Sequence, residues 1–356
     1  MNTDIPFIQY YSEINKCFEL EGCINPIALP PPPPPNYKSY VYAGFSPGTV
    51  GSPGIIDQID SSTMTIIKTF TAPAGHSWVY SLTYDGTYIY AGYVTSPGIV
   101  DQINSSNMNV VRSFTAPSGH GKVYALTYDG KYIYAGYDVS PGIVDQINPS
   151  TMTLVNTFNA PSGHNYVWTL TFDGKYIYAG YFNRNPGIID KIDPTTMYLV
   201  KSFTAPSGHT WLTSLTYDGT YIYAGYLTSP GIIDKIDPST MTLVKTFTAS
   251  HNNVNALTYD GTCIYAGYDV KSGAVDQISP STMTLIKTFT PPSGHSYVYA
   301  LTYDGAYIYA GYGVGPGIDK INPSNMTLVN SLTGPAYTLY ALTQNIVKGN
   351  NYAVFK

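Results

Sequence analysis

A unit of about 44 residues with four apolar, β-forming runs recurs along most of the chain. In one copy the runs are residues 123–128, 132–137, 143–147 and 152–158. Asp129-Gly130 separates the first two runs and favours a tight hairpin, because glycine tolerates positive φ. Asn148-Pro149-Ser150-Thr151 forms a second turn, in which Asn caps its own backbone and Pro presets φ. No run shows a 3.6-residue period, so the unit predicts four antiparallel strands.

Seven copies of the unit can be counted. The string Tyr-Ile-Tyr-Ala-Gly-Tyr, or a close variant of it, starts at residues 40, 88, 132, 176, 221, 263 and 307. A β-rich period of this length is typical of β-propellers. The third run also carries one aspartate in every copy: Asp57, Asp101, Asp145, Asp190, Asp234, Asp276 and Asp319. The sequence therefore predicts an all-β fold, a seven-bladed β-propeller of four-stranded blades.

The ends of the chain are expected to close this ring. The first unit lacks its own first strand, whereas the C-terminal region has a spare one. We expect residues 340–343 to pair with residues 40–45, which removes the open edges of a linear array. Residues 352–356 also resemble a second strand and could compete with residues 40–45 or dock elsewhere.

Two segments precede the propeller, which is assigned to residues 37–356. Residues 1–29 lack the repeat pattern, and residues 30–36 form a polyproline spacer, since an unbroken run of prolines adopts a stiff polyproline II helix. The apolar side chains of residues 1–29 suggest an attachment segment for assembly into a virion or surface layer. The alternative is that this segment folds back onto the rim of the propeller.

The repeat resembles the YVTN family of β-propeller repeats over about residues 40–345. Asp173-Gly174-Lys175-Tyr176-Ile177-Tyr178 matches the family's turn and Tyr-rich strand, and Ile189-Asp190-Lys191-Ile192-Asp193-Pro194 looks like its third strand. The resemblance implies surface-layer or cell-surface proteins of archaea, and we consider a virion protein of an archaeal virus. Related propellers serve in quinoprotein enzymes and lyases. The unit also looks like the tryptophan–aspartate repeat at Gly163-His164, although the terminal Trp-Asp is absent.

Amino-acid composition limits the partners and the locations that can be expected for this protein. Charged residues make up only 11% of the chain, the net charge is −5, and 36 tyrosines are present. Without clustered Lys and Arg, nucleic acid is not expected as a partner. No apolar run is long enough for a membrane-spanning helix. The N-terminus has no basic region followed by an apolar one, so no Sec signal peptide is expected. A sparsely charged, hydroxyl-rich surface suits a virion or an extracellular surface, although duplication of one Tyr- and Thr-rich ancestor explains it as well.

The cysteines and histidines offer candidate chemistry. Cys17 and Cys23 could pair if oxidised, whereas Cys263 replaces a repeat Tyr in the core. One histidine per unit stands in the loop before six of the first strands, at one face of the propeller. We interpret these histidines as structural, each hydrogen-bonded to a neighbouring loop, rather than as metal ligands, because ligands must converge on one ion. The six are His76, His120, His164, His209, His251 and His295. The seven aspartates are likewise interpreted as acceptors for Tyr hydroxyls or backbone amides.

The positions that follow each histidine vary between units and are the predicted ligand-binding set. Aromatic side chains there could stack on sugars or anchor a protein partner, or they could simply plug the axial channel. Arg184 is added because its loop breaks the pattern of its equivalents. The candidates are Trp78, Tyr80, Lys122, Tyr166, Trp168, Arg184, Trp211 and Tyr297.

No catalytic constellation stands out, so no enzyme activity, metal or cofactor is expected. The favoured function is a structural or adhesive display protein that presents a Tyr/Trp-rich face to a protein or glycan, as a virion surface component. A secreted or surface-layer propeller of a cell is the close alternative. A quinoprotein- or lyase-type enzyme and an intracellular scaffold are the others.

Overall fold

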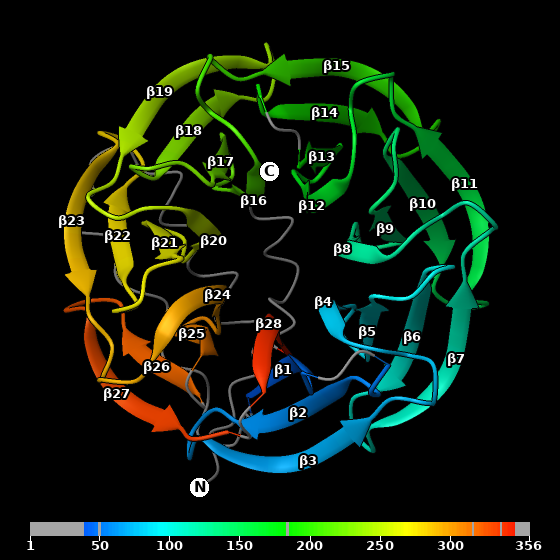
Figure 1. Cartoon of the computed structure of the whole chain (residues 1–356), viewed down its shortest axis with the longest axis horizontal. Helices are drawn as coiled ribbons and strands as arrows, with labels where there is room; N and C mark the ends of the chain where they lie inside the picture. The colour runs from blue at the N-terminus through cyan, green and yellow to red at the C-terminus, as the bar shows by residue number, and fades with distance from the viewer. Residues whose placement is uncertain (1–38, 49–50, 183–184, 315–316, 335–336, 346–356) are drawn as a thin grey trace, which may run out of the picture. The chain divides into compact units, whose positions relative to one another are not determined.

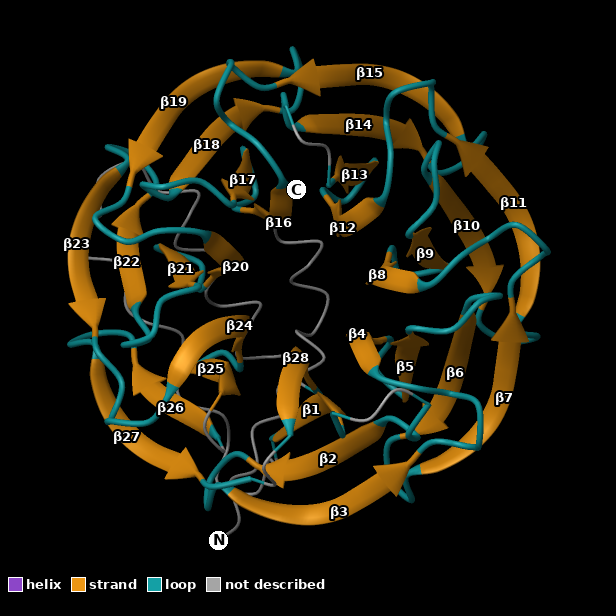
Figure 2. Cartoon of the chain, in the orientation of Figure 1, coloured by secondary structure: helices purple, strands orange, loops and turns teal. Residues whose placement is uncertain are grey.

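Seven four-stranded antiparallel sheets, the blades, stand around a common axis (Figure 1). The computed structural model describes residues 39–48, 51–182, 185–314, 317–334 and 337–345. All regular structure in these residues is β, as Figure 2 shows, and the seven-bladed fold that the repeat predicts is confirmed. None of the described residues forms a helix that could cross a membrane.

Each blade runs from an inner strand at the axis to an outer strand at the rim (Figure 1). Blade 1 contains β28, β1, β2 and β3, and blades 2 to 7 follow in chain order from β4–β7 to β24–β27. The inner strands are β4 (Val79–Tyr84), β8 (Val123–Tyr128), β12 (Val167–Phe172), β16 (Leu212–Tyr217), β20 (Val254–Tyr259), β24 (Ser296–Tyr303) and β28 (Thr338–Gln344). The second strands are β1 (Tyr40–Ser46), β5 (Tyr88–Tyr93), β9 (Ile133–Tyr137), β13 (Ile177–Tyr181), β17 (Ile222–Tyr226), β21 (Ile264–Tyr268) and β25 (Ile308–Val314).

The third and fourth strands complete each sheet. The third strands are β2 (Ile55–Asp60), β6 (Ile99–Asn104), β10 (Ile143–Asn148), β14 (Ile188–Asp193), β18 (Ile232–Asp237), β22 (Val275–Ser279) and β26 (Ile318–Asn322). The outer strands are β3 (Thr65–Thr71), β7 (Asn109–Thr115), β11 (Thr153–Asn159), β15 (Tyr198–Thr204), β19 (Thr242–Thr248), β23 (Thr284–Phe289) and β27 (Thr327–Leu332).

The core lies between neighbouring blades. Every residue of β9 is buried, because both faces of this strand are covered by adjacent blades. The blades approach so closely that a Cβ atom added to Gly136 would lie 2.4 Å from Cγ1 of Val167 in the next blade. This contact explains why the second strand carries glycine at this position, between Ala135 and Tyr137.

The turn predicted at Asp129-Gly130 is held by one carboxylate. Asp129 Oδ1 accepts hydrogen bonds from the backbone N of Lys131 at 2.7 Å and of Tyr132 at 2.6 Å, and its Oδ2 accepts from the Tyr134 hydroxyl at 2.7 Å. Gly130 has a φ of 94°, which a residue with a side chain rarely adopts. The same arrangement in other blades fixes where each inner hairpin turns.

Hydrogen bonds between blades also form a ring. A Gln or Lys of each third strand reaches the turn that precedes the outer strand of the next blade. Gln146 Nε2, for example, donates to Pro194 O at 2.8 Å. The bond from Lys320 Nζ to Ser61 O, at 2.7 Å, joins blade 7 to blade 1 and completes the ring, although the two residues lie 259 positions apart.

Pairing of the chain ends is confirmed. β28 and β1 are antiparallel neighbours, with Tyr42 opposite Thr343 and Ala43 opposite Leu342. Asn345 Oδ1 accepts a further bond from Tyr40 N at 2.7 Å. Residues 1–29, the polyproline spacer, Cys17, Cys23, Arg184 and residues 346–356 lie outside the described residues, so the expectations for them stay predictions. Cys263 is a buried free thiol, and burial raises its pKa to about 11.

Candidate functional site

The six histidines lie at one end of the axis, in the loops that lead from each outer strand to the next inner strand; we call this end the His face. The expected bond to a neighbouring loop is made by the backbone: the O atoms of five histidines accept from a glycine N that precedes the third strand of the preceding blade, for example Gly142 N to His164 O at 2.7 Å. Their side chains instead meet the third-strand aspartates of the blades that they lead into. Nδ1 of five histidines lies 2.7–3.1 Å from Oδ2 of the aspartate 24–26 residues later: His76–Asp101, His120–Asp145, His164–Asp190, His209–Asp234 and His295–Asp319. His251 is displaced, with its Nε2 4.0 Å from Asp276 Oδ1.

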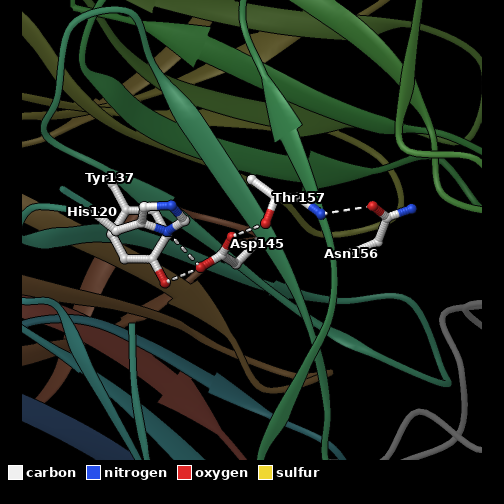
Figure 3. A network of polar contacts seen from close by, with 5 residues as sticks. All are labelled: His120, Tyr137, Asp145, Asn156 and Thr157. Carbon is white, nitrogen blue, oxygen red and sulfur yellow. Dashed lines mark hydrogen bonds and ion pairs between the residues drawn. The ribbon is translucent and has the colours of Figure 1, made fainter. Parts of the chain in front are cut away.

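Three of the aspartates, Asp145, Asp190 and Asp319, each accept from a histidine, from a tyrosine hydroxyl and from a Ser or Thr hydroxyl, as shown for blade 3 in Figure 3. Asp145 is fully buried and accepts from His120 Nδ1 at 2.9 Å, from the Tyr137 hydroxyl at 2.9 Å and from Thr157 Oγ1 at 2.7 Å (Figure 3). These three donors compensate the carboxylate for the loss of water. The network joins the inner loop, the second, third and outer strands of one blade, which is a structural role.

Blade 1 departs from this pattern. Phe45 stands where other blades have the tyrosine, and no histidine precedes β28. Asp57 is buried and accepts from Thr69 Oγ1 at 2.6 Å. Burial raises the pKa of Asp57, and the Thr69 bond only partly opposes this shift. The closing blade therefore carries a less well compensated carboxylate.

No metal-binding group of three or more His, Cys, Asp or Glu residues occurs within the part of the chain that the structure describes. Each histidine belongs to its own blade and faces its own aspartate. The expectation that these histidines hold no metal stays a prediction.

A β-bulge at the start of every inner strand turns one extra side chain toward the axis. In blade 3, Val123 pairs with Tyr137 and Ala125 with Gly136, so Tyr124 is the extra residue. Bulges redirect side chains at functional sites in many sheets. The extra residues of the seven blades are Tyr80, Tyr124, Trp168, Thr213, Asn255, Tyr299 and Tyr340.

Most of these side chains meet as a continuous series of aromatic rings. We define the aromatic arc as Tyr299, Tyr340, Tyr80, Tyr124, Trp168, Phe182 and Trp211. Ring centroids along this series lie 5.7, 4.6, 4.4, 4.4, 4.4 and 6.3 Å apart, and all but the Tyr80–Tyr124 contact are stacked. Tyr80 also contacts Trp168 two blades away at 5.7 Å, which places the arc across the axis.

Strained backbone holds a second set of side chains near the arc, and one of them, Trp211, also belongs to the arc. The residue two positions before the bulged residue has a φ of 51–60° in five blades, although none is glycine: Trp78, Tyr166, Trp211, Asn253 and Tyr297. Such φ values are unusual for bulky residues and persist where the surroundings impose them. Tyr166 and Trp211 are 40% and 38% exposed on the His face.

The arc is open at blade 6. Asn253, Asn255 and Asp269 occupy this opening, which we call the polar gap. Burial raises the pKa of Asp269, although the Asn253 and Asn255 amides lie close enough to oppose the shift. The buried Nδ2 of Asn255 has no hydrogen-bond partner of normal geometry among the described residues, and the Asp269 carboxylate is the group with which the Asn255 amide interacts.

A second unusual acid lies in blade 3. Asp138 Oδ2 is 3.9 Å from Lys122 Nζ, and the two side chains are 26% and 45% exposed. Burial raises the pKa of Asp138, and the nearby Lys122 charge partly opposes this shift. Lys122 is thus part of an ion pair at the same face as the arc.

The structure brings together Tyr80, Trp168 and Trp211 of the predicted set in the arc and pairs Lys122 with Asp138. Trp78, Tyr166 and Tyr297 hold the strained position of their own blades, and Arg184 is not described. The sequence analysis missed Asp138 and Asp269. The position after each Tyr-Ala-Gly-Tyr string, or its Phe variant in blade 1, could have revealed them, since it varies between blades and is acidic in only two: Ser46, Val94, Asp138, Phe182, Leu227, Asp269 and Gly313.

Two axial cavities lie behind this face. One of about 190 Å³ is lined by Tyr124, Trp168, Asn255 and Tyr340 and by the leucines of the inner strands. The other, of about 210 Å³, lies at the opposite end and is lined largely by Thr and Tyr side chains of the inner strands. The aromatic arc therefore caps a small axial space on the His face.

Comparison with known proteins supports the fold alone. No protein-family model matches the sequence, and no curated protein matches it either. The computationally designed protein Ika8 is similar in structure, with a TM-score of 0.62 and 15% identity over 85% of this chain and 90% of Ika8. The Cps50 (Swd1) β-propeller domain of Myceliophteria thermophila has a TM-score of 0.61 and 15% identity over 76% of this chain and 90% of that domain. At such identities these neighbours establish the β-propeller fold of this chain.

Proposed function

We propose that this chain is a non-catalytic binding protein that presents the His face to a glycan. The observation that supports this most is the aromatic arc, whose rings come from six of the seven blades and which ends at the exposed Trp211. Aromatic faces stack on the C–H faces of sugars, and a few polar groups nearby fix the orientation of a ligand. Asp269 and Asn253 supply such groups at the open side of the arc.

A glycan fits this face better than a protein partner. A protein interface of standard size buries about 800 Å² on each side around large apolar anchors. The large apolar side chains exposed on the described part of the His face are Tyr166, Trp211 and Val314. The rest of the arc is recessed, and its neighbours are amides and carboxylates. This combination suits a small hydroxyl-bearing ligand.

The setting we propose is display on a virion or a cell surface. The low charge content and the resemblance of the repeat to a family with surface-layer members support it. Comparison of intact chain with chain lacking residues 1–35 would test it, since only the intact chain should join its particle or layer.

Binding to an array of immobilised glycans, followed by titration calorimetry with the best ligand, tests the function. Trp211→Ala should weaken binding at least about tenfold, because it removes one stacking face worth about 1.4 kcal/mol or more. Tyr198→Ala is the matched control, since Tyr198 is 75% exposed on the outer strand β15, away from the axis. Equal affinities of the two variants, or an array on which the wild type binds nothing, would refute the proposal.

A further inference from the structure

The polar gap interrupts an otherwise aromatic series. At the bulged position, five blades carry Tyr or Trp, whereas neighbouring blades 5 and 6 carry Thr213 and Asn255. β16, β20 and β24 follow one another around the axis in Figure 1, so these residues lie on the open side of the arc. Such a break in the repeat symmetry indicates a role for these side chains that the equivalent side chains of the other blades do not have.

Thr213 is already used by the fold. It is buried, and its hydroxyl bonds to the backbone oxygens of Gly225 and Val254. Asn255 differs, because it lines the axial cavity and its buried Nδ2 has no partner of normal geometry among the described residues, although its amide interacts with the Asp269 carboxylate. A buried donor without a well-formed hydrogen bond costs about 1–3 kcal/mol, so a ligand hydroxyl that completes the bond would be favoured.

Asp269 supplies the complementary acceptor. It follows β21, its backbone N donates to Asn253 O at 2.9 Å, and its carboxylate interacts with the Asn253 and Asn255 amides. Its charge also acts on Tyr299 of the arc: burial and then the Asp269 charge raise the pKa of Tyr299. One donor and one charged acceptor thus stand together beside an aromatic ring.

Gly313 keeps the neighbouring ring in place. A Cβ atom added there would lie 2.4–2.8 Å from three ring carbons of Tyr299. Other blades carry larger residues at this position, for example Leu227. The glycine therefore lets the Tyr299 ring lie against β25 of its own blade, beside the polar gap.

We infer that the polar gap is the subsite that reads a vicinal diol of a hexose residue, with Asn255 Nδ2 donating to one hydroxyl and the Asp269 carboxylate accepting from the next. Tyr299 and Tyr340 of the arc supply the apolar wall on which the sugar ring stacks. The inference rests on the proposed glycan-binding function and adds the residues that select the sugar. A ligand that lacks either hydroxyl should lose the polar contact to that hydroxyl and keep the other.

The test compares two acids at the same repeat position. Asp269→Val installs the residue that blade 2 carries as Val94, and Asp138→Val makes the same change in blade 3. Titration with the methyl glycoside of the best array sugar should show about tenfold to hundredfold weaker binding for Asp269→Val, the range for a lost hydrogen bond to a charged group. Asp138→Val should bind within about twofold of wild type.

Deoxy glycosides locate the contact. For the analogue that lacks the hydroxyl read by Asp269, the wild type and Asp269→Val should bind equally, because the double-mutant cycle then has no remaining interaction to lose. Where Asp269→Val fails to fold by circular dichroism, Asn255→Ala replaces it with the same expectation for the adjacent hydroxyl.

The failures are distinguishable. If the wild type binds a glycan through Trp211 while Asp269→Val and Asp138→Val have equal affinities, this subsite is wrong and the proposed function stands. If every deoxy analogue loses the same affinity in Asp269→Val as in wild type, the subsite is also wrong. If the wild type binds no glycan, the proposed function and the subsite are both overturned.

Discussion

Replacing Asp145 by asparagine should destabilise the propeller, whereas the same change at Asp57 should not. Asp145 accepts three side-chain hydrogen bonds, from His120, Tyr137 and Thr157. Asp57 lies at the equivalent position of blade 1, where Phe45 offers no hydroxyl. Asparagine has the shape of aspartate, so neither variant opens a cavity.

The expected loss of stability in Asp145→Asn follows from the hydrogen bonds that each carboxylate oxygen of Asp145 accepts. In Asp145→Asn the remaining carbonyl oxygen can still accept from Thr157, but the amide NH₂ replaces the oxygen that accepted from His120 and Tyr137. Tyr137 is fully buried, so its orphaned hydroxyl costs about 1–3 kcal/mol. The His120 side chain is 12% exposed and can turn to water, which limits its loss to about 1 kcal/mol. Relief of the buried charge offsets part of this cost, leaving a net loss of about 2 kcal/mol.

Asp57→Asn should leave stability unchanged or raise it. Its amide oxygen still accepts from Thr69, as Asp57 does at 2.6 Å. Burial raises the pKa of Asp57, which means that the charged form is disfavoured in the folded state. A neutral amide removes that penalty, so we expect a gain of up to about 1 kcal/mol at pH 7.

Urea denaturation followed by far-UV circular dichroism measures both variants. With a slope near 3 kcal/mol per molar urea, a loss of about 2 kcal/mol lowers the midpoint by about 0.7 M. Unchanged slopes would show that the unfolding transition is comparable in all three proteins. Midpoints of the two variants within about 0.2 M of each other would refute the compensation argument, as would a lower midpoint for Asp57→Asn.

Three further predictions concern closure of the ring and its charges. Lys320→Met should lower the free energy of unfolding by about 1–3 kcal/mol, because Ser61 O loses its donor. Lys320→Gln introduces the residue that four blades carry at this position and should leave stability nearly unchanged. Equal melting curves for the two variants would contradict this. Removal of residues 336–356 takes away β28 and should lower the melting temperature by more than 10 °C, an outcome that an unchanged thermal scan would exclude. The folded-state pKa of Asp57 is raised, so its contribution to stability is complete below its ordinary pKa of 3.8 and is lost as the pH rises through the raised value. The urea midpoint of wild type minus that of Asp57→Asn should therefore fall as the pH rises. A difference that does not change with pH would count against a buried carboxylate.

Local chemistry explains what the sequence predicted well. The Asp-Gly turn at Asp129-Gly130 is encoded by residues that contact each other within five positions, so its place could be inferred before the structure. The blade number follows from counting the seven recurring aspartates. The closure of the ring follows from the surplus strand at the C-terminus and from the rule that exposed sheet edges are avoided. The strands, the blade number and the closure by β28 follow from such information.

Partners far apart in the chain were harder to infer. His120 and Asp145 were each recognised as recurring residues, but their bond joins a loop to a strand 25 positions later and depends on how that blade packs. Nothing in the alternation of apolar and polar residues indicates this pairing.

The sequence by itself determined the repeat, the strands and the seven-bladed closure, because these depend on short-range turns and on a count of similar units. Only the tertiary structure decided which variable residues meet. A bulge in each inner strand turns one side chain toward the axis, and the closed ring brings Tyr80 within reach of Trp168 two blades away. The gap at Asn255 and Asp269 exists only in relation to that arc, so it could not be recognised before the blades were placed around one axis.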